Sequence, residues 1–155
     1  MAVAQLQRAV AWDGDSAPLR HELAIALSQA GRSDDAVVAL QHALRLEPHE
    51  AQHAYALGLA QNEAGDVRAA VAAFERAVAL DPKLTRAWYN LSLARDHTGD
   101  VQGALAALAG ADAASPGEPD VARARALILA RQRQVAGRVT VASTTFPSPA
   151  SPGLE

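Results

Sequence analysis

The chain has 155 residues, half of them hydrophobic, with few aromatic residues and no cysteine. The lack of cysteine excludes disulfide frameworks, thiol catalysis and thiolate metal sites. The net charge of −3 is unevenly distributed, because residues 1–120 carry −7 whereas residues 121–155 carry +4. Nucleic-acid binding usually needs a basic face, which only the arginine-bearing end offers, so we expect no nucleic-acid partner.

Membrane and targeting signals are weak throughout the sequence. No apolar run approaches the roughly 18 residues that a membrane-spanning helix needs. The first residues lack a basic segment followed by an apolar block, which a secretory signal would show. We therefore expect no membrane partner and a cytoplasmic location, or a periplasmic one if the chain is excised from a larger protein.

A spacing of 34 residues runs through the middle of the chain. It relates Gly31, Gly65 and Gly99. Four further columns follow the same spacing: Leu23, Leu57 and Leu91; Ala36, Ala70 and Ala104; Ala43, Ala77 and Ala111; Pro48, Pro82 and Pro116. A single period over five columns indicates a repeat architecture.

Each repeat is expected to be a pair of antiparallel helices. In the third copy, Trp88 and Leu91 share one helical face, and a stripe of alanine and leucine follows from residue 101 to 111. Gly99 lies where a left-handed residue ends a helix easily, and Asp100 is placed to cap the next helix. The predicted repeats are 17–50, 51–84 and 85–118, with helices near 17–30, 33–46, 51–64, 67–80, 85–98 and 101–114.

The two flanks are expected to extend this array. Residues 1–15 match the second helix of a pair and lack the first, so Val3, Leu6 and Val10 are expected to have an uncovered side. We favour a start in the middle of a repeat over a terminal cap. Residues 119–136 are predicted to form a capping helix, and residues 137–155 a disordered tail rich in serine and proline. As an alternative role, Arg123, Arg125 and Arg131 of that helix form a site for an acidic ligand.

The period and its residues resemble the tetratricopeptide repeat family over residues 17–118. Trp88 and Leu91 match the start of its signature, Leu57–Gly58 the next part, and Ala70 to Phe74 with Pro82 the remainder. Ser92 stands where the family prefers glycine, and Leu27, Gln61 and Arg95 stand where it usually has tyrosine. The resemblance implies an all-α, right-handed superhelix of antiparallel helix pairs, acting as a protein–protein interaction module that binds a peptide or helix of a partner protein in a concave groove.

In that family the first helix of each pair lines the groove. Helical spacing nominates three equivalent pairs, each on one helical face, with two polar neighbours: His21 and Ile25, Tyr55 and Leu59, Tyr89 and Leu93, beside Arg86 and Asn90. The family's clamp for a terminal carboxylate uses asparagine and lysine. Here Ile25, Leu59 and Leu93 replace asparagine and the groove has no lysine, so we predict an apolar channel with tyrosine anchors for a hydrophobic or amphipathic segment.

Two alternatives to this interpretation are kept. In the first alternative, the nominated side chains only pack against one another or against flanking helices. In the second, the chain is a structural or self-assembly segment of a larger protein, and it forms a homodimer through the exposed ends of the array, using Val3, Leu6 and Val10 or the outer side of 119–136.

One segment matches a metalloprotease motif: His49-Glu50-Ala51-Gln52-His53 has the H-E-x-x-H spacing of zinc ligands and a general base. That motif works in the middle of a helix, whereas this copy directly follows Pro48 at an expected helix start. We expect no catalytic zinc, with adventitious binding through His49 and His53 as the alternative. No phosphate loop, nucleophile elbow or dinucleotide fingerprint is present, so we expect no enzyme, no catalytic or metal residues and no cofactor.

Overall fold

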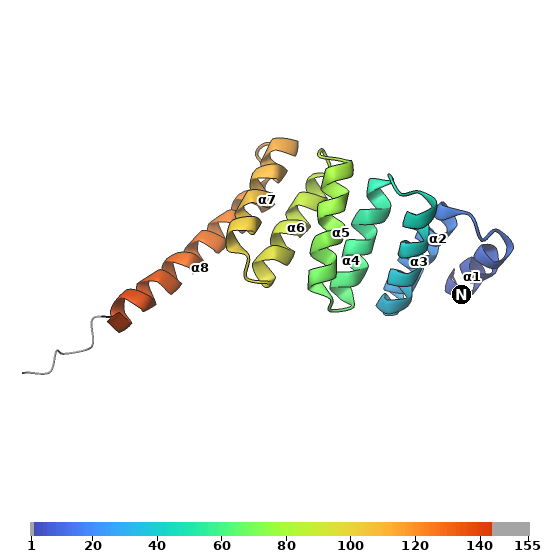
Figure 1. Ribbon diagram of the computed structural model, residues 1–155, viewed down its shortest axis with the longest axis horizontal. Helices are drawn as coiled ribbons and strands as arrows, with labels where there is room; N and C mark the ends of the chain where they lie inside the picture. Colours follow the sequence, from blue (N-terminus) through green and yellow to red (C-terminus); the bar gives the residue numbers. More distant parts are fainter. Residues whose placement is uncertain (1, 144–155) are drawn as a thin grey trace, which may run out of the picture.

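The computed structural model describes residues 2–143, which form eight α-helices and no strand. In chain order these are α1 (Ala2–Trp12), α2 (Ala17–Gln29), α3 (Ser33–Leu46), α4 (Ala51–Glu63), α5 (Val67–Leu80), α6 (Thr85–His97), α7 (Val101–Ala114) and α8 (Pro119–Ser143). Figure 1 shows them stacked in this order, with α8 extending away from the stack. The predicted all-α architecture is confirmed.

Helices α2 and α3, α4 and α5, and α6 and α7 pack as pairs, and the second helix of each pair also packs on the first helix of the next. Helix α1 packs on α2, and α8 packs on α7. Contacts therefore join neighbours along the chain, as in other repeat folds, and α2 with α4 is the notable contact between two first helices.

The turns between paired helices have the predicted chemistry. Gly31, Gly65 and Gly99 all have positive φ, from 74° to 87°, a conformation that glycine adopts without a Cβ penalty. Asp100 accepts a hydrogen bond from the Gly103 amide at 2.9 Å, and Asp66 accepts one from the Ala69 amide at 3.0 Å. Short, well-capped turns of this kind fix each pair as a hairpin.

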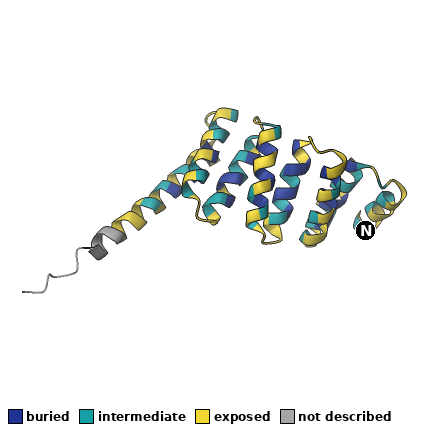
Figure 2. Cartoon of the chain, in the orientation of Figure 1, coloured by how far each residue is buried: buried dark blue, intermediate teal, exposed yellow. Residues whose placement is uncertain are grey.

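Small side chains bring the helices close together, and a few large ones fill the space between them. Buried alanines recur on α3, α5 and α7, while Phe74 and Leu108 are the large, fully buried residues at equivalent positions of the second and third repeats. The ring of Phe74 lies so close to Gly58 that a Cβ added there would be 2.5 Å from its Cε1 atom. Figure 2 shows the buried residues along the centre of the stack.

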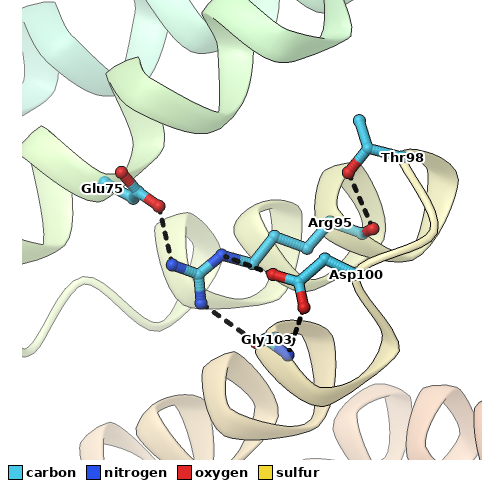
Figure 3. A network of polar contacts seen from close by, with 5 residues as sticks. All are labelled: Glu75, Arg95, Thr98, Asp100 and Gly103. Atoms are coloured by element: carbon cyan, nitrogen blue, oxygen red, sulfur yellow. Dashed lines mark hydrogen bonds and ion pairs between the residues drawn. The ribbon is translucent and has the colours of Figure 1, made fainter.

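Arg95 holds three helices together at one position where the family usually has tyrosine. Its guanidinium donates to Glu75 Oε1 on α5 at 2.6 Å and to the Gly103 carbonyl on α7 at 3.1 Å, and it lies 3.9 Å from the Asp100 carboxylate (Figure 3). The departure from the family pattern therefore replaces an aromatic contact with a polar one that joins α5, α6 and α7.

The N-terminal flank differs in part from its prediction. Val3, Leu6 and Val10 pack against the main core, which reduces the expected uncovered side, but they are only partly buried and α1 has no buried residue. An amphipathic helix docks its apolar stripe on whatever apolar surface is available, and here that surface is α2.

The C-terminal flank also differs. Helix α8 continues to Ser143, beyond the predicted end at residue 136, so the tail cannot begin at residue 137. Gly137 weakens a helix by about 1 kcal/mol, but no proline follows before residue 147 and helix propagation is cooperative. The rest of the predicted tail, 144–155, lies outside the described residues.

Ion pairs within the chain anchor α8. Arg131 donates to both carboxylate oxygens of Asp96 on α6 at 2.9 and 3.1 Å, and Arg125 bonds to Asp112 on α7. Arg123 pairs with Asp120 on α8 itself. The alternative that these three arginines bind an acidic ligand is therefore not supported, because each already has a carboxylate partner.

Across residues 2–143, no helix is both long enough and apolar enough to cross a bilayer.

Candidate partner-binding groove

The first helices α2, α4 and α6, together with the start of α8, meet on one side of the stack, which we call the first-helix face. Two hollows lie on this face. One is at the junction of α4, α6 and α8 and measures about 320 Å³. The other lies between α2 and α4 and measures about 350 Å³. We call them the tyrosine hollow and the histidine hollow.

Four of the eight sequence-nominated residues meet in the tyrosine hollow: Tyr55, Arg86, Tyr89 and Asn90. The Asn90 amide donates to the Tyr55 hydroxyl at 3.2 Å and to the Arg86 carbonyl at 2.9 Å. The Arg86 guanidinium lies 5.7 Å from the centre of the Tyr55 ring, within the range of a cation–π contact. This arrangement holds the Tyr55 ring in place between α4 and α6.

The rest of the tyrosine hollow is contributed by α6 and by the segment that begins α8. Thr85 and Val121 add small and apolar surface, while Glu118 and Asp120 add carboxylates. Asp120 is partly neutralised by Arg123 at 3.0 Å. The hollow therefore combines aromatic walls with one cation, Arg86, and two carboxylates, and it is not the basic surface that a clamp for a carboxylate needs.

The histidine hollow contains one nominated residue, His21, and one that the groove prediction missed, His53. Their Nδ1 atoms are 2.9 Å apart, and His53 Nε2 lies 2.9 Å from Glu47 Oε2. His53 is 5% exposed, whereas Glu47 is largely exposed. Pro18, Glu22, Glu50 and Gln52 complete the lining.

Burial and the neighbouring His53 lower the pKa of His21 below its ordinary value of 6.5, although Glu22 and Glu50 act in the opposite direction. His21 is thus mainly neutral at neutral pH, in a hollow whose other charged groups are carboxylates.

The remaining nominated residues, Ile25, Leu59 and Leu93, line neither hollow. Ile25 and Leu93 are 41% and 42% exposed, and Leu59 is partly buried against the main core. They stand one helical turn further along α2, α4 and α6 than His21, Tyr55 and Tyr89, and the apolar channel stays a prediction.

The H-E-x-x-H segment has a structural explanation. Helix α4 begins at Ala51, and Glu50 caps it by accepting a hydrogen bond from the Gln52 amide at 3.1 Å. His49 is exposed in the turn, whereas His53 points to His21 and Glu47. Within residues 2–143, no group of three or more histidine or acidic side chains is arranged to hold a metal ion.

Several solved structures have a similar fold and a low sequence identity to this chain. A crystal structure of MamA matches with a TM-score of 0.72 and 20% identity, covering 87% of this chain and 89% of that one. The TPR domain of Arabidopsis OM64 matches with a TM-score of 0.69 and 18% identity, covering 74% and 95%. The first TPR of Spaghetti (RPAP3), bound to the HSP90 peptide SRMEEVD, matches with a TM-score of 0.71 and 16% identity, covering 76% and 93%.

Sequence comparison identifies a family but no individual relative. No curated protein matches the chain significantly. The tetratricopeptide repeat model, in contrast, matches residues 21–84 and 63–119, which span most of the three helix pairs. These two matches and the superhelical fold show that the chain belongs to the tetratricopeptide repeat family.

Proposed function

We propose that the chain is a protein–protein interaction module that binds a segment of a partner protein along the first-helix face. The observation that carries this proposal is the tyrosine hollow, where Tyr55 and Tyr89 line a space large enough for one side chain and Tyr55 is held by Arg86 and Asn90. Rigid aromatic groups at a partly open hollow are typical anchors of protein interfaces.

The chemistry of the hollow favours an apolar or amphipathic segment over an acidic one. Glu118 and Asp120 at its edge repel a carboxylate, and Arg86, the basic residue of its lining, is engaged with the Tyr55 ring. Spaghetti (RPAP3), the neighbour of similar fold, is seen with the peptide SRMEEVD, which is acidic near its C-terminus. We therefore propose a different ligand class for this chain, with an apolar side chain inserted between Tyr55 and Tyr89.

Photo-crosslinking tests the surface before the partner is known. A crosslinking amino acid is placed at Leu93, exposed on α6, and in a second variant at Val38, which is 56% exposed on α3, a second helix. We expect a specific adduct from position 93 and none from position 38. Equal labelling at both positions contradicts the proposal.

The captured partner is then titrated against point variants. Tyr55→Ala should weaken binding by about 30-fold, because loss of an interface anchor typically costs about 2 kcal/mol. Val38→Ala is the matched control and should leave the affinity unchanged. If Tyr55→Ala keeps both its helical circular dichroism and its full affinity, the tyrosine hollow is not the binding site.

A second candidate function is self-association through α8. Leu127 and Val135 are 61% and 59% exposed, and Val135 lines a hollow of about 610 Å³ together with Ile128, Arg131 and the turn at Gly99. The α1 end of the array offers less exposed apolar surface for a dimer contact, because its apolar stripe is already packed on the core. Sedimentation of Leu127→Glu tests this alternative: a dimer that dissociates in this variant supports it, and a chain that is monomeric at high micromolar concentration excludes it.

A further inference from the structure

His21 and His53 make a direct polar contact between α2 and α4 on the first-helix face. Their Nδ1 atoms are 2.9 Å apart, and their ring centres are 4.9 Å apart with a tilt of 41°. The nitrogen on the other side of the His53 ring lies 2.9 Å from Glu47 Oε2, in the turn before α4. Three titratable groups therefore form one hydrogen-bonded row across the junction of the first two repeats.

The hydrogens in this row are constrained by their partners. An ionised carboxylate only accepts hydrogen bonds, so His53 Nε2 carries a hydrogen and donates it to Glu47. In the neutral pair, His53 Nδ1 is then the acceptor and His21 Nδ1 is the donor. One additional proton is tolerated, because whichever imidazole stays neutral still offers an Nδ1 lone pair.

A second additional proton is not tolerated. Both Nδ1 atoms then carry hydrogens that face each other across 2.9 Å, neither can accept, and two positive rings are held in contact. The contact must open or the rings must turn away. Since His53 is almost fully buried and His21 only partly, His21 is the ring that moves, and we expect α2, which carries it, to shift away from α4 locally.

We infer that the His21–His53 pair is a pH-sensitive joint between the first and second repeats, closed when the pair carries no more than one excess proton and opened by the second. Its regulatory meaning rests on the proposed function, because the joint sets how α2 and α4 present the groove. The joint itself exists whether or not a partner binds.

The charged groups that face the joint are mostly carboxylates. Glu22 faces it from α2, and Glu47 and Glu50 face it from the turn before α4; Arg76 on α5 holds that turn by donating to the Pro48 carbonyl at 2.7 Å. The carboxylates favour the first excess proton. Burial and the first positive ring oppose the second, in line with the lowered pKa of His21.

The next junction along the array provides an internal comparison. There the contact between first helices is Asn90 to Tyr55, from an amide to a phenol hydroxyl at 3.2 Å. An amide and a phenol hydroxyl pair as neutral donor and acceptor, and this contact needs no proton from solvent. Acidification should therefore open the first junction and leave the second unchanged.

Pulsed electron paramagnetic resonance can measure both junctions in one chain. The sequence has no cysteine, so paired cysteine substitutions give unambiguous spin labels. Gln29, Glu63 and His97 are exposed and occupy equivalent positions near the ends of α2, α4 and α6. The 29/63 pair reports the first junction and the 63/97 pair the second, in the full chain without any partner.

Between pH 7.5 and pH 5.5 we expect the 29/63 distance distribution to become longer and broader while the 63/97 distribution stays the same. His21→Asn keeps an amide that can bond to His53 Nδ1 but cannot take up a proton, so it should make the 29/63 distribution independent of pH. His49→Asn, the same change in an exposed turn, should behave as the parent chain does.

Two outcomes overturn the joint: a 29/63 distribution that does not change on acidification, or a change that persists in His21→Asn. If that variant is unfolded at pH 7.5, imidazole titration of the parent chain by nuclear magnetic resonance decides. The joint is also overturned if this titration shows both rings protonated while the 29/63 distance is unchanged. Because no partner is added, this test separates the joint from the proposed binding function.

Discussion

Gly58 and Ser92 occupy equivalent positions, 34 residues apart, yet they meet different surroundings. Gly58 lies against the ring of Phe74, with no space for a Cβ. In the next repeat Leu108 replaces Phe74, and the smaller neighbour leaves room for a side chain. Ser92 fills that room, fully buried, but its hydroxyl has no hydrogen-bond partner.

Alanine substitution at these two positions should therefore act in opposite directions. Ser92→Ala removes an unpaired buried hydroxyl and should stabilise the fold by about 1 kcal/mol. Gly58→Ala forces a methyl group into Phe74 and should destabilise it by about 1–3 kcal/mol. Urea unfolding of both variants checks this, and a destabilised Ser92→Ala would mean that the hydroxyl is bonded after all.

At the scale of the elements, Arg95 joins α5, α6 and α7 through one side chain. Arg95→Ala should destabilise the array by about 1–2 kcal/mol, because it removes a partly buried charge-assisted network and its packing. Arg32→Ala is the control, since Arg32 pairs with Asp35 on the surface of a single helix, where such pairs contribute about 0.5 kcal/mol or less.

Thermal or urea unfolding measures the two arginine variants side by side. Equal effects would show that the contacts between helices contribute no more than a surface pair. A double-mutant cycle with Glu75→Ala then gives the part of the effect that belongs to the link between α5 and α6.

The elements were largely predictable, because a 34-residue period fixes both helices and their turn at once. The helices of all three pairs begin at the residues that the spacing predicts. The end of α8 was not predictable in the same way: the period stops there, and Gly137 alone does not end a helix.

The candidate site was predictable only in part. The repeat pattern nominated Tyr55 and Tyr89, but it could not reveal His53, whose equivalents Leu19 and Ala87 are apolar. Which side chains touch across a junction depends on the rotation between neighbouring repeats, and that rotation arises from packing and not from the period. Whether the nominated residues bind a partner stays a prediction.

At the scale of the whole molecule, acid should weaken the fold. The pKa of His21 is below its ordinary value in the folded chain, so the unfolded chain binds more protons as the pH falls through about 6.5. Stability is therefore complete above this range and declines below it, until the lowered pKa is reached. His42 contributes with the same sign, because burial and then Arg45 and Arg20 lower its pKa.

Urea unfolding at pH 7.5 and pH 5.5 measures this loss, and each histidine can be removed in turn. His21→Asn and His42→Asn should each make the free energy of unfolding at pH 7.5 and at pH 5.5 more nearly equal than in the parent chain. A parent chain that is more stable at pH 5.5 than at pH 7.5 would contradict the sign of both shifts.

Helix α8 has a mechanical consequence that follows from its length. Val121 lies at the tyrosine hollow, and Ser143 lies 22 residues further along the same helix, about 33 Å away at a rise of about 1.5 Å per residue. A tilt of about 5° at Val121 displaces the far end by about 3 Å, by simple leverage. A ligand in the tyrosine hollow that tilted α8 at Val121 would therefore move the far end of this helix, well outside the stack, by a larger distance than its start (Figure 1).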